Sequence, residues 1–176
     1  AKLGLKPGNN GSWEQFYPVY KDTLISAGFS IAGTDYQLGK DFAAALTSIN
    51  SGKIFASEVV YLSKNDTLTD IKGKVVLLAG AQPARNVLMK LMSNQPAAIL
   101  FMQSGIDKQP VQRSGSIYKS LFKARQTPLS IRISEEMGKA ILMDDFTNAK
   151  EQQLETKTYT LPVAISFDKQ TSTIQA

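Results

Sequence analysis

Two short apolar runs, separated by a stretch with helical periodicity, constrain the fold of this chain more than any other feature. The runs are 75–79 and 97–102, and each has the length of a buried strand rather than of a buried helix. Pro83 suits the first turn of a helix between them. Apolar residues at helical spacing then follow: Val87, Leu88, Leu91 and Met92. Apolar strands joined by a helix are typical of a parallel β-α-β unit that is covered on both faces.

The segments around this unit predict further elements. Residues 129–133 alternate apolar with polar side chains and indicate a half-buried strand, and 134–144 follow as a helix with Ser134 as its cap. The apolar face predicted for that helix comprises Met137, Ala140, Ile141 and Met143. A strand is also expected at 54–62. We therefore predict an α/β fold with a mixed sheet around strands 75–79, 97–102 and 129–133 and helices near 83–93 and 134–144.

Three other segments carry more specific expectations. Residues 156–167 alternate like a strand, in which Pro162 marks an edge or a bend. Residues 42–46 suit a strand, although their alanines leave a short helix open. Residues 70–74, Asp-Ile-Lys-Gly-Lys, read as a turn.

The chain of 176 residues contains no histidine and no cysteine. A Ser-His-Asp triad, a Cys-His dyad and a zinc site of the usual His/Cys type are therefore excluded. The adjacent carboxylates Glu135-Glu136 and Asp144-Asp145 diverge by roughly 100° on a helix, so we interpret them as surface and cap residues. Gly80–Arg85 follows a strand but lacks both nucleotide-binding fingerprints. No catalytic or metal-ligating residue is assigned, and no apolar run reaches the length of a membrane span.

Positive charge gathers in the middle of the chain, where ten basic residues lie between Lys72 and Arg132 against the single acid Asp107. Residues 103–127 form a long connection, and long loops of this kind are typically functional or disordered. The candidate interaction residues on it are Lys108, Arg113, Tyr118, Lys119, Phe122, Lys123 and Arg125. Cations mixed with aromatics can bind nucleic acid, but the chain carries only +5 overall and no known nucleic-acid motif, so we do not favour that role.

The apolar residues of this connection suggest local structure. Ile117, Tyr118, Leu121 and Phe122 follow an i, i+1, i+4, i+5 pattern, which is compatible with a short amphipathic helix or a hairpin tip. The alternative is a surface loop whose apolar residues fold back onto the domain.

The order of elements resembles a protease-associated domain. Its landmarks are the Asp-x-Lys-Gly-Lys turn running into a hydrophobic strand at 70–78, the strand Ala-Ala-Ile-Leu-Phe at 97–101, and the strand and acidic helix start at 127–138. The resemblance covers about residues 54–145. It implies an α/β fold of the protease-associated type, with a mixed, partly barrel-like β-sheet flanked by a few helices.

Residues 3–13 resemble the segment that leads into such a domain in bacterial zinc aminopeptidases of the MH clan. The resemblance implies an entry segment at 1–20, the protease-associated domain at 21–168 and an exit segment at 169–176. It further implies a parent enzyme exported to the periplasm or cell exterior, with its zinc in a catalytic domain outside this chain. The chain itself would hold no cofactor and would act as a non-catalytic lid, substrate filter or interaction module.

The partners expected from this resemblance are the parent's own catalytic domain in cis and a peptide substrate or protein. The resemblance also implies that the loop at 103–127 lies over that catalytic domain and helps to gate peptide entry. The alternative is a free-standing binding module for an acidic partner or nucleic acid.

Overall fold

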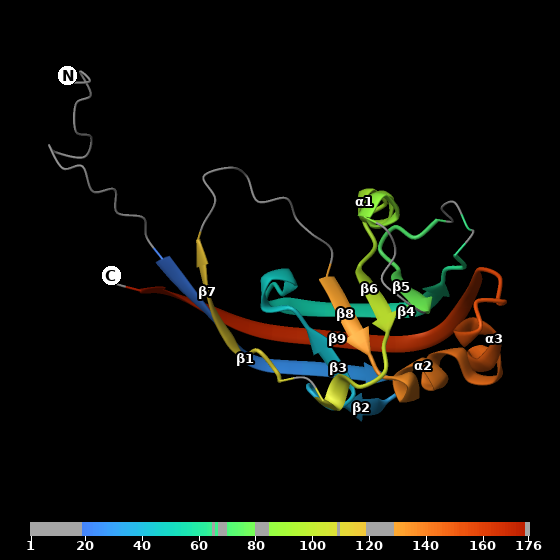
Figure 1. The fold of residues 1–176 in the computed structure, drawn as a ribbon, viewed down its shortest axis with the longest axis horizontal. Helices are drawn as coiled ribbons and strands as arrows, with labels where there is room; N and C mark the ends of the chain where they lie inside the picture. Colours follow the sequence, from blue (N-terminus) through green and yellow to red (C-terminus); the bar gives the residue numbers. More distant parts are fainter. Residues whose placement is uncertain are drawn as a thin grey trace, which may run out of the picture.

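The computed structural model describes residues 19–64, 66, 70–79, 85–108, 110–118 and 129–174. Its centre is a mixed sheet with the strand order β2-β1-β9-β4-β5-β6-β8-β3, to which β7 adds by pairing with β1 (Figure 1). The end strands β2 and β3 lie next to each other in sequence, linked only by residues 37–41. The sheet therefore curls so that its two ends come close together, which gives the partly barrel-like α/β architecture expected from the sequence.

The strands are Val19–Ile31 (β1), Thr34–Tyr36 (β2), Phe42–Ala44 (β3), Gly52–Tyr61 (β4), Val75–Ala79 (β5), Ala98–Met102 (β6), Ser114–Tyr118 (β7), Leu129–Ile133 (β8) and Lys157–Ile174 (β9). The α-helices are Arg85–Ser93 (α1), Glu135–Leu142 (α2) and Phe146–Lys150 (α3). Short 3₁₀ turns occupy Leu46–Ser48, Ile106–Lys108 and Met143–Asp145.

The predicted β-α-β unit is confirmed. β5 and β6 are parallel neighbours, and β8 continues the parallel set beside β6. Val75, Leu77 and Leu100 face the interior of the curled sheet, whereas Val76 and Ile99 face α1. Both faces of these strands are covered, which explains their unbroken apolar sequence.

The helices differ from the predicted apolar faces at one residue each. Val87 of α1 is 42% exposed, because the helix contacts the sheet mainly through buried Leu91 and half-buried Leu88 and Met92. Met143 is 64% exposed, because α2 ends at Leu142 and the chain turns there. The fully buried Leu142 takes the place expected for Met143.

The start of α2 is as predicted. The Ser134 side chain accepts a hydrogen bond from the Met137 N–H, which caps the helix, and Glu135 and Glu136 lie in its first turn. α2 and α3 lie together at one end of the curled sheet (Figure 1).

The expected strand at 156–167 is part of the much longer β9, which pairs with β1 on one side and β4 on the other. Pro162 lies beside a register shift against β4, and its carbonyl accepts the Ala32 N–H at 2.8 Å where β1 ends. The missing N–H therefore falls at an irregularity, so the bend reading is correct and the edge reading is wrong.

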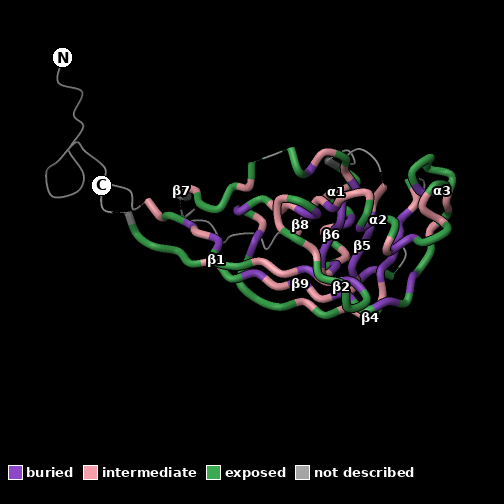
Figure 2. Tube along the Cα trace, turned by 90° about the horizontal axis from the view of Figure 1, so that it is seen from below, coloured by how far each residue is buried: buried purple, intermediate pink, exposed green. Residues whose placement is uncertain are grey.

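β1 and β9 extend beyond β4 and the parallel strands as a long ribbon, to which β7 adds by pairing with β1, and this ribbon carries both ends of the described chain (Figure 1). Buried positions gather around β5, β6 and β8, whereas the far part of the ribbon is largely exposed or half-buried (Figure 2). The ribbon still holds one buried ion pair, between Asp22 and Lys169 at 2.8 Å.

Two ambiguous segments are resolved. Residues 42–46 begin as strand β3 and continue into a 3₁₀ turn, so each of the two readings holds for part of the segment. Within the long connection, Ser114–Tyr118 is strand β7, antiparallel to β1. The helical pattern drawn through Ile117 and Tyr118 is therefore wrong, since strand pairing fixes their backbone, and Leu121 and Phe122 lie outside the described residues.

Candidate functional site

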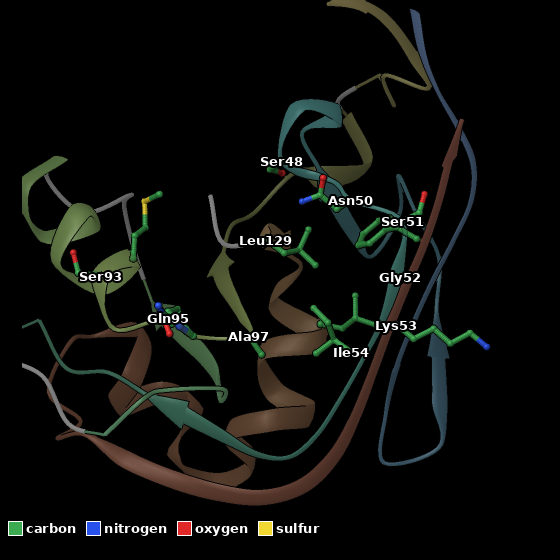
Figure 3. A pocket seen from close by; sticks show the side chains of 14 residues that line it. Ser48, Asn50, Ser51, Gly52, Lys53, Ile54, Ser93, Gln95, Ala97 and Leu129 are labelled. Atoms are coloured by element: carbon green, nitrogen blue, oxygen red, sulfur yellow. The ribbon is translucent and has the colours of Figure 1, made fainter. Parts of the chain in front are cut away.

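A cavity of about 640 Å³ opens where β4 separates from the parallel strands (Figure 3). We call it the β4 groove. One wall is the start of β4, and the other is the end of α1 with the residues before β6 and the first residue of β8. Its lining comprises Ser48, Asn50, Ser51, Gly52, Lys53, Ile54, Met92, Ser93, Gln95, Pro96, Ala97, Leu129, Ile165 and Phe167. The volume lies within the range of small-molecule and peptide pockets.

The groove exists because β4 pairs with β5 through only three described residue pairs, Val59 to Tyr61 against Val75 to Leu77. The first half of β4 pairs with β9 alone among the described strands. Ile165 and Phe167 of β9, which are 2% and 5% exposed, contribute apolar surface to the lining, together with half-buried Ile54 and Leu129.

The hydroxyl groups of the groove already have partners. Ser51 Oγ donates to the Lys169 carbonyl at 3.0 Å and accepts from the Lys169 N–H at 2.8 Å. Ser48 Oγ donates to the Ala45 carbonyl at 2.8 Å, and Ser93 Oγ donates to the Met89 carbonyl at 2.9 Å. A hydroxyl held in this way supports the local chain, and the described lining offers no adjacent base to activate it as a nucleophile.

At the lip of the groove, one residue adopts an uncommon backbone conformation. Gln95 has a φ of +51°, which side-chain-bearing residues seldom adopt. Its carbonyl accepts the Gly73 N–H at 2.9 Å, which ties the lip to the predicted turn at 70–74. Gly73 takes a φ of +70° there, so the turn is confirmed and uses its glycine for backbone freedom.

The groove is electrically neutral over most of its surface. Lys53 is the one charged residue among the described lining, and its side chain points away from the cavity (Figure 3). The arrangement can therefore hold an apolar or uncharged chain through packing and backbone contacts, and it offers no paired acid and base for chemistry.

A second cavity, of about 390 Å³, lies beside the predicted interaction loop and is lined in part by Tyr36 and Arg113. Burial, with smaller contributions from Asp41 and Glu136, raises the pKa of the Tyr36 phenol above its usual value of 10.0. The phenol is therefore a neutral hydrogen-bonding group at physiological pH. Neither Tyr36 nor Arg113 is positioned to act as a general acid or base in this cavity.

The structure places the predicted interaction residues only in part. Lys108 and Arg113 are exposed, and the Arg113 carbonyl accepts the Leu24 N–H at 2.8 Å. The backbone of Tyr118 pairs with Val19 in the β7–β1 ladder. The remaining candidates, Lys119, Phe122, Lys123 and Arg125, lie outside the described residues, as does most of the Gly80–Arg85 turn. A binding role for this loop stays a prediction.

The adjacent carboxylates separate as expected. Glu135 pairs with Lys150 at 3.0 Å on the surface. Asp145 accepts from the Tyr159 hydroxyl at 2.7 Å and from the Lys157 ammonium, which connects the 3₁₀ turn after α2 to the start of β9. Those bonds, led by the one from Lys157, lower the pKa of Asp145 below its usual 3.8. Burial and Asp145 raise the pKa of Tyr159.

No group of three or more His, Cys, Asp or Glu side chains in the described part of the chain could hold a metal ion. In the same part, no helix has the length and apolar character to cross a membrane.

No protein-family model matches this chain, and no curated protein matches it in sequence. Nine chains of solved structures match it, among them a peptidase M28 precursor from Shewanella amazonensis SB2B. That structure superposes with a TM-score of 0.47 at 14% sequence identity, over 88% of this chain. The chain spans 39% of the length of that precursor.

Sequence reasoning missed the β4 groove. Its lining comes from four separate parts of the chain, and none of them carries a motif. Gly52 marks the start of β4, but a single glycine does not predict a groove. The split between β4 and β5 depends on where their pairing begins, and that register is a property of the assembled sheet.

Proposed function

We propose that this chain is a non-catalytic, protease-associated accessory domain that binds peptide segments in the β4 groove. The observation that carries the proposal is the groove itself, which has an apolar floor, hydroxyl groups already bonded to the chain and no acid-base pair among its described lining. Such a lining favours holding a chain over cleaving it.

The parent protein in this proposal is an exported zinc aminopeptidase. Support comes from the landmarks at 70–78, 97–101 and 127–138 and from the entry-like segment at 3–13. The curled mixed sheet agrees with the fold that those landmarks imply. In the parent, the domain would lie beside its own catalytic domain and help to select or retain peptide substrates.

Zinc belongs to the catalytic domain of that parent. The described residues of this chain do not fit a zinc site, because their side chains offer no converging ligand set and the sequence has no histidine or cysteine. No step of peptide hydrolysis is therefore assigned to residues of this chain. The proposed boundaries remain 1–20 for entry, 21–168 for the domain and 169–176 for exit.

The proposal is tested by panning a random peptide library displayed on phage over the immobilised chain. We expect enrichment of peptides with apolar side chains, and loss of that enrichment in Ala97→Trp, which fills the groove. Ser172→Trp, at an exposed position far along β9, serves as the matched control and should retain binding.

The same chain is incubated with the enriched peptides and zinc, and the products are followed by mass spectrometry. The peptides should remain intact. Cleavage at a rate above that of a heat-denatured sample, or equal enrichment on Ala97→Trp and wild type, would contradict the proposal.

A further inference from the structure

The first half of β4 presents an unpaired strand edge to the β4 groove. Pairing with β5 begins only at Val59, whereas pairing with β9 runs back to Gly52. An open edge inside a sheet is a template for another strand, because its N–H and C=O groups lack partners.

The direction of these groups follows from the neighbouring strands. In an antiparallel pair, alternate residues aim both their N–H and C=O at the same neighbour. Lys169 aims both groups toward β4, since both bond to the Ser51 hydroxyl. Pro162 aims its carbonyl the other way, toward Ala32 at the end of β1. The N–H and C=O groups of odd-numbered residues of β9 therefore point toward β4, and those of even-numbered residues point toward β1.

The register then assigns the two sides of β4. Residues 167, 165 and 163 of β9 are opposite Gly52, Ile54 and Ala56. The N–H and C=O groups of these three residues of β4 therefore hydrogen-bond to β9. Lys53 and Phe55, between them, aim their N–H and C=O groups away from β9. No described residue hydrogen-bonds to those four groups.

The groove supplies the other requirements of a strand-binding site. Side chains of an added strand alternate between its two faces. One set would pack on Ile54 and Leu129, and the other set would lie beside Phe55, which is 75% exposed. The described lining carries no carboxylate, and the Lys53 side chain points away from the cavity, so a neutral or apolar strand is favoured over a charged one.

We infer that the β4 groove binds an extended, uncharged peptide segment as an added β-strand, through the backbone groups of Lys53 and Phe55. This inference rests on the proposed function, and it names the class of ligand and the mode of binding. Main-chain hydrogen bonds would give the affinity, and the pocket for alternate side chains would give the preference for apolar residues.

Hydrogen exchange measured by NMR tests the inference on the wild-type chain. The probe is an acetylated and amidated heptapeptide of alternating threonine and valine. In the free protein, the amides of Lys53 and Phe55 should exchange fast, whereas those of Ile54 and Ala56, bonded to β9, should be protected. Saturation with the probe should slow the first two at least tenfold. A probe N-methylated at alternate residues, on the edge that meets β4, should not do so.

A matched pair of variants tests the same edge. Phe55→Pro removes an N–H that faces the groove and leaves the bonds to β9 in place. It should weaken probe binding by roughly tenfold or more, as expected for lost backbone bonds and a blocking ring. The matched control is Thr173→Pro, at an exposed odd-numbered position of β9 outside the groove, which likewise removes an N–H that points away from β1. Its affinity for the probe should stay within about twofold. The thermal transition of each variant verifies that it is folded.

Each other outcome overturns strand addition. Protection of Lys53 and Phe55 in the free protein would mean that the edge is already paired. Failure of the probe to bind, or binding that leaves these two amides unprotected, would exclude this mode of binding. The library selection with Ala97→Trp still decides the proposed function in those cases, so the two failures are distinguishable.

Discussion

Asp22 is a buried carboxylate whose charge is balanced by a neighbouring lysine. It is 1% exposed, pairs with Lys169 at 2.8 Å and accepts from the Thr171 hydroxyl at 2.7 Å. Asp22→Ala would leave the largely buried Lys169 ammonium without this counter-charge. We expect the free energy of unfolding to fall by about 3 kcal/mol, measured by urea denaturation.

The matched control for that change is Asp168→Ala, an exposed carboxylate on the same pair of strands. Its effect should stay within about 0.5 kcal/mol. Equal losses of unfolding free energy in both variants would show that the net charge of the chain, rather than the buried Asp22–Lys169 pair, determines the stability of the ribbon.

Asp145 gives stability a dependence on pH in the acid range. Its pKa in the folded chain is lowered by Lys157 and Tyr159, so the unfolded chain binds the proton more readily. The contribution of Asp145 is therefore complete above the ordinary value of 3.8 and is lost as the pH falls through the lower folded value.

Asp145→Asn should accordingly be less stable than wild type at pH 7, and the gap should close in strong acid. Thermal melts over this pH range measure it. Asp144→Asn, at the exposed neighbouring carboxylate, is the control and should track wild type. A gap that stays constant with pH would contradict the role given to the Asp145 carboxylate.

At the scale of single elements, α2 depends on its cap. Ser134 accepts the Met137 N–H at 3.3 Å, and α2 places three of its residues in the central core. Ser134→Ala should cost about 1 kcal/mol of unfolding free energy, and Ser134→Asp, which can still cap, should retain most of it. Chemical denaturation of the two variants compares them, and equal losses would mean that the cap contributes little.

The elements found from sequence are those whose pattern is local. β5, β6 and β8 are apolar or alternating runs, and α2 has both a cap and a period. The exposed Val87 shows the limit, since helical spacing defines a face without saying how wide a stripe the sheet covers. β7 was missed because its pairing with β1 joins residues nearly a hundred positions apart in the chain.

At the scale of the whole molecule, Phe42 links the two ends of the curled sheet. Its ring is fully buried and meets Phe29 of β1 edge-on at 5.4 Å and Phe167 of β9 at 6.5 Å between centroids. Phe42→Ala should lower the free energy of unfolding by about 3–5 kcal/mol.

The control for Phe42→Ala is Phe55→Ala, which removes the same side chain from an exposed site. It should change stability by no more than about 0.5 kcal/mol. Comparable losses in urea unfolding would show that the sheet is not closed around Phe42.

The curled sheet could be predicted only from the resemblance to a known domain. No local sequence pattern predicts that β2 and β3 come close together. The binding site shows the same limit more strongly. The positive charge of residues 103–127 predicted an interaction site on that loop, whereas the β4 groove is neutral and lies where β4 and β5 separate. A neutral site built from scattered residues leaves no mark in composition.

The most direct measurement of the central claim is an NMR titration of the isotopically labelled chain with a peptide enriched from the library. The account predicts that amide shifts gather on the β4 groove, at Ile54, Ala97 and Leu129. Shifts that gather instead on the cationic segment around Lys108 and Arg113, with the groove unchanged, would contradict it.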